Sequence, residues 1–156
     1  SLGGGRAASP AGAEPGGVVT DLLDTSTLVR YLTLDPPDLG ALAQQLIDSG
    51  EKLTIPCVAL AETAFVLTRL YGIDRAAAVD LLVELLGRSN LTVLELPSPL
   101  AIEALLLCRP SGRVSFADAL IWAAARNTGT GRVHTFDARF PAIGITLQVL
   151  GGRPAK

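Results

Sequence analysis

The sequence is poor in aromatic residues and in histidine. Aromatic side chains make up 4% of its 156 residues, His134 is the only histidine, and methionine is absent. The core must therefore be built from Leu, Val, Ile and Ala, a composition that suits helices packed on a sheet. A hydrophobic content of 49% and a charged content of 18% indicate one globular domain and argue against a disordered chain.

Cysteine is also scarce, and both cysteines lie in apolar stretches. Cys57 and Cys108 are the only two. A single histidine and no paired-cysteine motif argue against a zinc site. The two cysteines are predicted to be free thiols in a reducing cytoplasm, with a disulfide between them as the minor alternative.

Long apolar runs and targeting signals are absent as well. No run approaches the roughly 18 residues that a membrane-spanning helix needs, and the N-terminus lacks the basic-then-apolar order of a signal peptide. Residues 1–17 are mostly Gly, Ala and Pro, so we expect a flexible leader or an expression remnant there. The folded domain is expected over 18–150, followed by a flexible tail at 151–156.

Basic and acidic residues are nearly equal in number but unevenly distributed along the chain. The net charge is −2, yet residues 1–103 carry 6 basic and 13 acidic side chains, a net of −7. Residues 104–156 carry 7 basic and 2 acidic side chains, a net of +5. Chance scatter is one explanation, and a phosphate-attracting surface is the other. The arginines that would form this surface are Arg109, Arg113, Arg126, Arg132 and Arg139.

Helical and strand patterns alternate along the chain. Strands are predicted at 18–23, 53–55, 91–96, 132–135 and 145–150. Helices are predicted at 25–32, 39–49, 56–71, 74–87, 99–108 and 115–127. This alternation predicts an α/β fold with a parallel sheet covered on both faces. Ligands in such folds gather at the carboxyl ends of the strands.

Two carboxylates stand alone in apolar helical segments. Glu62 and Asp118 are the only charges between 57 and 67 and between 114 and 125. A buried carboxylate without a partner costs several kcal/mol, so metal coordination is one explanation for each. The alternatives are an ion pair with a buried arginine for Glu62, and a capping box with Ser115 for Asp118.

Two more carboxylates follow predicted strands. Asp24 comes directly after 18–23, and Asp137 follows 132–135. Alone, each has an ordinary explanation, a helix N-cap for Asp24 and a turn residue for Asp137. Together with Glu62 and Asp118 they form an oxygen ligand set that suits Mg²⁺ or Mn²⁺. A bound ion of this kind could activate water for attack on a phosphodiester.

The order and spacing of these segments resemble the PIN domain, and most closely the VapC toxin ribonucleases of bacterial toxin–antitoxin pairs. The resemblance runs from about 18 to 150. It rests on four short motifs, each weak alone: Leu23-Asp24-Thr25-Ser26 with Leu28-Val29-Arg30-Tyr31-Leu32, Ile55-Pro56 with Leu60-Ala61-Glu62, Ser115-Phe116-Ala117-Asp118-Ala119-Leu120-Ile121, and Thr135-Phe136-Asp137.

This resemblance implies a three-layer α/β/α sandwich with a central, mainly parallel sheet. It also implies an endoribonuclease dependent on Mg²⁺ or Mn²⁺, with tRNA or rRNA as substrate. Its catalytic and metal-binding residues would be Asp24, Glu62, Asp118 and Asp137. Hydroxyl groups of Ser26 and Thr135 would orient ligands or water. A homodimer and a VapB-type antitoxin that covers the active site are implied too. The apolar helices near 39–47 and 76–86 are either the dimer interface or ordinary core-facing helices.

Other functions stay open at this stage. A phosphatase with an aspartyl nucleophile would need a second aspartate two residues after Asp24, where Ser26 stands. The segment 127–131 is Gly-rich but lacks the lysine and the spacing of a phosphate-binding loop. A DNA flap nuclease would need helical insertions and basic stretches to grip a duplex. The alternative from another class is a non-catalytic PIN-like module that binds protein or RNA.

Overall fold

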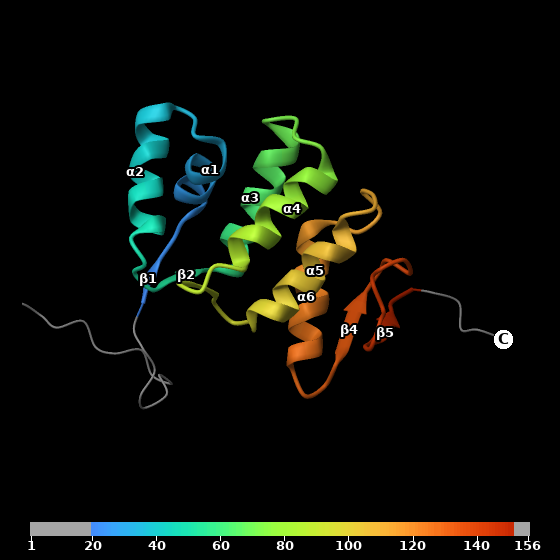
Figure 1. Cartoon of the computed structure of the whole chain (residues 1–156). Helices are drawn as coiled ribbons and strands as arrows, with labels where there is room; N and C mark the ends of the chain where they lie inside the picture. The colour runs from blue at the N-terminus through green and yellow to red at the C-terminus, as the bar shows by residue number, and fades with distance from the viewer. Residues whose placement is uncertain (1–19, 152–156) are drawn as a thin grey trace, which may run out of the picture.

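The computed structural model describes residues 20–151, in which helices and parallel strands alternate (Figure 1). The expected leader at 1–17 and nearly all of the expected tail lie outside the described residues. The described elements are β1 (Asp21–Leu22), α1 (Thr25–Thr33), α2 (Pro37–Asp48), β2 (Leu53–Ile55), α3 (Cys57–Arg69), α4 (Arg75–Leu86), β3 (Leu91–Val93), α5 (Ser98–Cys108), α6 (Phe116–Asn127), β4 (Arg132–Thr135) and β5 (Thr146–Val149).

Local sequence signals mark several helix ends. The Asp24 and Ser115 side chains cap α1 and α6, and Pro56 precedes the first residue of α3. Gly50 follows α2 with a φ of 86°, a conformation that glycine adopts without strain. Among the described helices, none combines the length and apolar character needed to cross a bilayer.

All strand pairs in the described part of the chain are parallel, as expected for this α/β fold. β2 lies between β1 and β3, with Leu53 opposite both Asp21 and Leu91. β4 pairs with β5 in a second sheet. Parallel strands with helices packed around them agree with the expected three-layer α/β/α fold.

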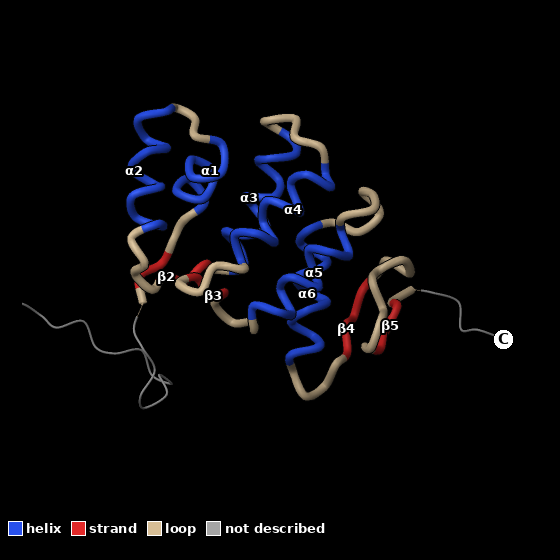
Figure 2. Tube along the Cα trace, viewed as in Figure 1, coloured by secondary structure: helices blue, strands red, loops and turns tan. Residues whose placement is uncertain are grey.

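The strands are divided into two sheets, whereas one central sheet was expected. Figure 1 and Figure 2 show β4 and β5 at the opposite end of the molecule from β1, beyond α5 and α6. β1 is only two residues long, and both its side chains, Asp21 and Leu22, are exposed. Such a strand carries no hydrophobic pattern that would specify a partner on its second edge.

The core is aliphatic, as the composition predicts. Leu60, Leu82 and Ile55 are fully buried, and Trp122 is 2% exposed. Cys108 is buried and Cys57 is half-buried, and both are free thiols. The disulfide alternative is therefore excluded in this structure.

Candidate functional site

Asp24 lies between β1 and α1 and caps the helix. Its Oδ1 accepts hydrogen bonds from the Thr27 backbone N–H, the Thr27 hydroxyl and the Ser26 hydroxyl, each at 2.9 Å. These bonds, led by that of the Thr27 backbone, lower the pKa of Asp24 from its ordinary value. The N-cap explanation is thus confirmed. It leaves an exposed, ionised carboxylate at the carboxyl end of β1, where a cation could bind.

Glu62 lies on α3 and faces the start of α1. Its Oε2 accepts a hydrogen bond of 3.0 Å from the hydroxyl of Thr25, the neighbour of Asp24. The expectation that Glu62 is buried is wrong, because its side chain is exposed. Val58 and Phe65 on the same helix are exposed too, so the apolar sequence of α3 overstates how deeply the helix is buried. Burial therefore gives no evidence that Glu62 binds metal. The evidence that remains is its position beside Thr25 and Asp24.

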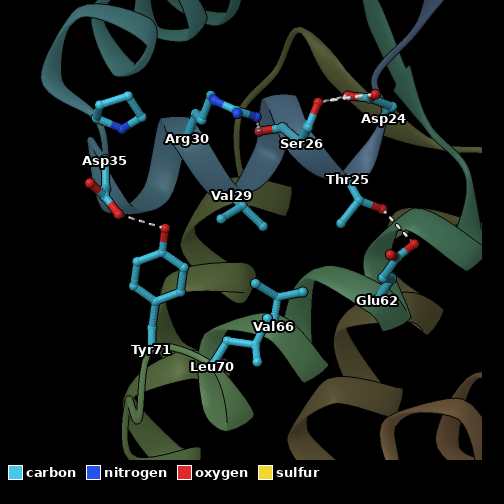
Figure 3. Close-up of a pocket in the computed structure, with 11 residues that line it drawn as sticks. Asp24, Thr25, Ser26, Val29, Arg30, Asp35, Glu62, Val66, Leu70 and Tyr71 are labelled. Carbon is cyan, nitrogen blue, oxygen red and sulfur yellow. Dashed lines mark hydrogen bonds between the residues drawn. The ribbon is translucent and has the colours of Figure 1, made fainter.

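A pocket of about 650 Å³ brings these two acids together (Figure 3). Its charged lining residues are Asp24, Asp35, Glu62 and Arg30. The Tyr71 hydroxyl donates to Asp35 Oδ2 at 2.9 Å, which joins the α1–α2 connection to the residues after α3. The pocket is therefore a cleft between α1 and α3, with two acids at one end and a tyrosine–aspartate contact at the other.

Asp118 is half-buried in the first turn of α6. Its backbone N–H donates to the Ser115 hydroxyl oxygen at 3.0 Å, so Ser115 acts as the predicted cap. Asp118 does not line the pocket of Asp24 and Glu62. Its helix nevertheless packs against α3, the helix of Glu62.

Asp137 lies in a turn after β4, and Figure 1 shows β4 at the opposite end of the molecule from β1, the strand that Asp24 follows. Its Oδ1 accepts from the Arg139 backbone N–H at 2.8 Å, and its own N–H donates to the Thr135 hydroxyl oxygen at 3.0 Å. The turn explanation for Asp137 is confirmed. Of the four predicted acids, the structure thus brings Asp24 and Glu62 together, with Ser26 beside them. Asp137 lies elsewhere, in contact with Thr135.

The chemistry of the pocket suits a hard divalent cation. Mg²⁺ is usually held by one or two carboxylates, with water and substrate phosphate completing its shell. Asp24 and Glu62 supply two such groups from adjoining helices. Within residues 20–151, no three His, Cys, Asp or Glu side chains gather closely enough to hold a metal ion. Asp24 and Glu62 are thus a pair of carboxylates at one end of the pocket and not a complete ligand set.

Three pocket residues with charged or aromatic side chains were not predicted as site residues: Arg30, Asp35 and Tyr71. Arg30 carried a usable signal, since it is the only charge within α1. Two of the predicted basic residues are already paired, Arg109 with Asp80 at 2.8 Å and Arg126 with Glu103 at 3.1 Å. They are less available to bind a phosphate than unpaired arginines would be.

Comparison with known families decides the assignment. The PIN domain family matches residues 22–145. The chain belongs to the PIN-domain family. No curated protein and no solved structure matches the chain. PIN domains are typically metal-dependent nucleases, so this PIN domain has a nuclease fold. All four predicted acids fall within the matched residues.

Membership of this family also bears on the alternatives. A PIN domain is a nuclease fold, which speaks against the aspartyl phosphatase. The Gly-rich segment 127–131 connects the end of α6 to β4, with Gly131 at a φ of 55°. A connecting turn explains its composition without a bound nucleotide.

Proposed function

We propose that this PIN domain is a divalent-metal-dependent endoribonuclease and the toxin of a bacterial toxin–antitoxin pair. The observation that carries the proposal is the Thr25–Glu62 hydrogen bond. Thr25 follows Asp24 directly, so this bond holds the two carboxylates on one pocket of a nuclease fold. The finer resemblance to VapC ribonucleases supports the toxin role.

Asp24 and Glu62 are the residues that would hold Mg²⁺ or Mn²⁺. When bound, such an ion stabilises charge on a phosphate and lowers the pKa of water. Ser26 and Thr27 donate hydrogen bonds to the Asp24 carboxylate and so keep it ionised and oriented. Thr25 donates a hydrogen bond to Oε2 of Glu62 and so orients that carboxylate. The order of the sequence motifs adds Asp118 and Asp137 as catalytic candidates, but neither lines this pocket, so the proposed metal contacts are those of Asp24 and Glu62.

The proposed substrate is RNA, with tRNA or rRNA as the class that the resemblance favours. The proposed partners are a VapB-type antitoxin and a second copy of the chain, acting in the cytoplasm. An exposed row of Leu39, Leu42 and Leu46 on α2 supports the use of this helix as a protein-binding surface, because such a row is one face of a helix.

The deciding experiment compares wild type with Asp24→Asn on total RNA and tRNA, in Mg²⁺, in Mn²⁺ and in EDTA. We expect cleavage by the wild type in either metal, no cleavage in EDTA, and none by the variant. Asparagine is as good an N-cap as aspartate, so the fold should survive. Cleavage by Asp24→Asn at the wild-type rate would overturn the site assignment.

One observation favours the non-catalytic module as a second candidate. Asp118 and Asp137 lie outside the pocket of Asp24 and Glu62, so four acids do not surround one point. A Glu62→Ala variant separates the two functions. Growth arrest and RNA binding by this variant at wild-type strength would favour the module, whereas loss of cleavage and of growth arrest with RNA binding retained would favour the enzyme.

A further inference from the structure

Among residues 20–151, Arg30 is the only cationic residue in a pocket that three carboxylates line (Figure 3). In the described part of the chain it forms no ion pair with any of the three. Its Nε is buried and has no hydrogen-bond partner. Its Nη1 makes a single long contact of 3.5 Å with the Ser26 carbonyl oxygen. Most of the guanidinium's donor capacity is therefore unused inside the cleft.

A guanidinium has five N–H donors in a planar fork that matches a phosphate in two-bond geometry. Within the described residues the terminal nitrogens of Arg30 make no bond besides the contact with Ser26, so their remaining N–H donors are free for an anion that enters the pocket. Arg30 follows Asp24 by six residues, which is about 9 Å along the helix axis. The side chain reaches back one turn, since Nη1 lies 3.5 Å from the Ser26 carbonyl oxygen, yet within the described residues it forms no ion pair with the acids.

We propose that Arg30 binds a backbone phosphate of the RNA adjacent to the one that is cleaved, and so positions the strand in the cleft. The inference rests on the proposed function, since it assigns a substrate contact to the same pocket. Val66, Leu70 and Tyr71 line the wall formed by α3 and the residues after it. They add an apolar surface against which a nucleotide can lie.

A purely structural role for Arg30 is the competing explanation. Arg30 is near enough to Asp24 to help keep its carboxylate ionised, but this is the smallest of the contributions to the Asp24 pKa. The hydrogen bonds from Thr27 and Ser26 contribute more and remain when Arg30 is replaced. Loss of Arg30 should therefore leave Asp24 ionised at neutral pH, and its effect should fall on RNA.

The test measures binding of a short, fluorescein-labelled single-stranded RNA by anisotropy, with every variant carrying Asp24→Asn to prevent cleavage. We expect Arg30→Gln to weaken binding about tenfold or more. The slope of log affinity against log salt should fall in magnitude by about 0.7, the value for one phosphate contact on a single strand. Arg30→Lys should restore the slope but only part of the affinity, because lysine lacks the fork.

Lys52→Gln is the matched control. It also removes one positive charge, but from an exposed residue just before β2, at the opposite end of that strand from the cleft. This variant should bind RNA as tightly as its parent. Mn²⁺ binding is measured in parallel on the Asp24-containing protein, where Arg30→Gln should match wild type.

Three results would overturn the proposal. Unchanged RNA affinity in Arg30→Gln would do so even if the wild type cleaves RNA, and would point instead to an anionic protein as the ligand of Arg30. Loss of Mn²⁺ binding in Arg30→Gln would show that Arg30 supports the metal-binding carboxylates instead of binding RNA. An equal loss of RNA binding in Lys52→Gln would show a general charge effect. The anisotropy assay measures RNA binding by variants that do not cleave. Failure of the nuclease proposal would appear in a different experiment, as RNA left uncut by the wild-type protein.

Discussion

At the scale of single residues, Asp24 combines two roles that substitutions can separate. Asp24→Ala removes the acceptor for the Thr27 backbone N–H and should lower the free energy of unfolding by about 1 kcal/mol. Asp24→Asn keeps an acceptor and should stay close to wild type. Both variants should lose RNA cleavage. Urea unfolding followed by the fluorescence of Trp122, the only tryptophan, measures the difference, and equal stability of the two variants would contradict the capping role.

The same residue predicts a dependence of stability on pH. Hydrogen bonds hold the pKa of Asp24 below its ordinary value of 3.8. A carboxyl whose pKa is lower in the folded chain contributes stability above its unfolded pKa and loses that contribution as the pH falls through the folded value. The stability difference between wild type and Asp24→Asn should therefore be flat from pH 7 to about pH 5. Below about pH 4 the free energy of unfolding of the wild type should fall relative to that of Asp24→Asn.

That difference can be measured by urea unfolding of both proteins at a series of pH values. The comparison isolates Asp24, because every other titrating group is common to the two proteins. A difference that changes mainly between pH 5 and pH 7 would contradict the prediction and would indicate another titrating group coupled to Asp24.

At the scale of elements, Arg75 joins α4 to the connection between α5 and α6. Its guanidinium donates hydrogen bonds to the carbonyl oxygens of Cys108 and Val114 and lies 4.3 Å from the centre of the Phe116 ring. Arg75→Ala leaves these carbonyls without their donor and should cost about 2–3 kcal/mol of unfolding free energy. Urea unfolding measures this loss.

Arg109→Ala is the control for Arg75. Arg109 pairs with Asp80 on the surface, where solvent screens the interaction and such pairs contribute little. The free energy of unfolding should therefore fall much less in Arg109→Ala than in Arg75→Ala. Equal losses in the two variants would show that the carbonyl contacts of Arg75 add nothing beyond a surface charge.

Element ends were largely predictable because their signals are local. The strands at 53–55 and 132–135 have the expected bounds, and α6 begins one residue after the expected cap at Ser115. The strand expected at 91–96 ends at Val93. Glu95 there has a φ of 72°, outside the range of extended backbone, and apolar composition alone does not reveal such a turn.

At the scale of the whole molecule, the separation of the two sheets predicts unequal roles for the four acids. Asp24→Asn and Glu62→Gln should each weaken Mn²⁺ binding about tenfold or more, since even indirect changes to a metal site have effects of that size. Asp137→Asn should bind Mn²⁺ as wild type does, because Asp137 follows β4, in a different sheet from the strand that precedes Asp24. Calorimetric titration of the purified variants measures each affinity.

Asp80→Asn serves as a control for the loss of one negative charge at an exposed site. A loss in Asp137→Asn equal to that in Asp24→Asn would show that the four acids meet around the metal in solution. It would then place β4 beside the free edge of β1, in one continuous sheet.

The sequence by itself determined the fold class, most helix ends, the free thiols and the position of Asp24 at a strand exit, because these depend on composition and on neighbours along the chain. Only the tertiary structure decided which strands pair, that Glu62 is exposed, and that Arg30 shares its pocket. Those features depend on contacts between residues distant in sequence. An apolar helix does not specify which of its sides will face solvent, and a two-residue strand does not specify its neighbour.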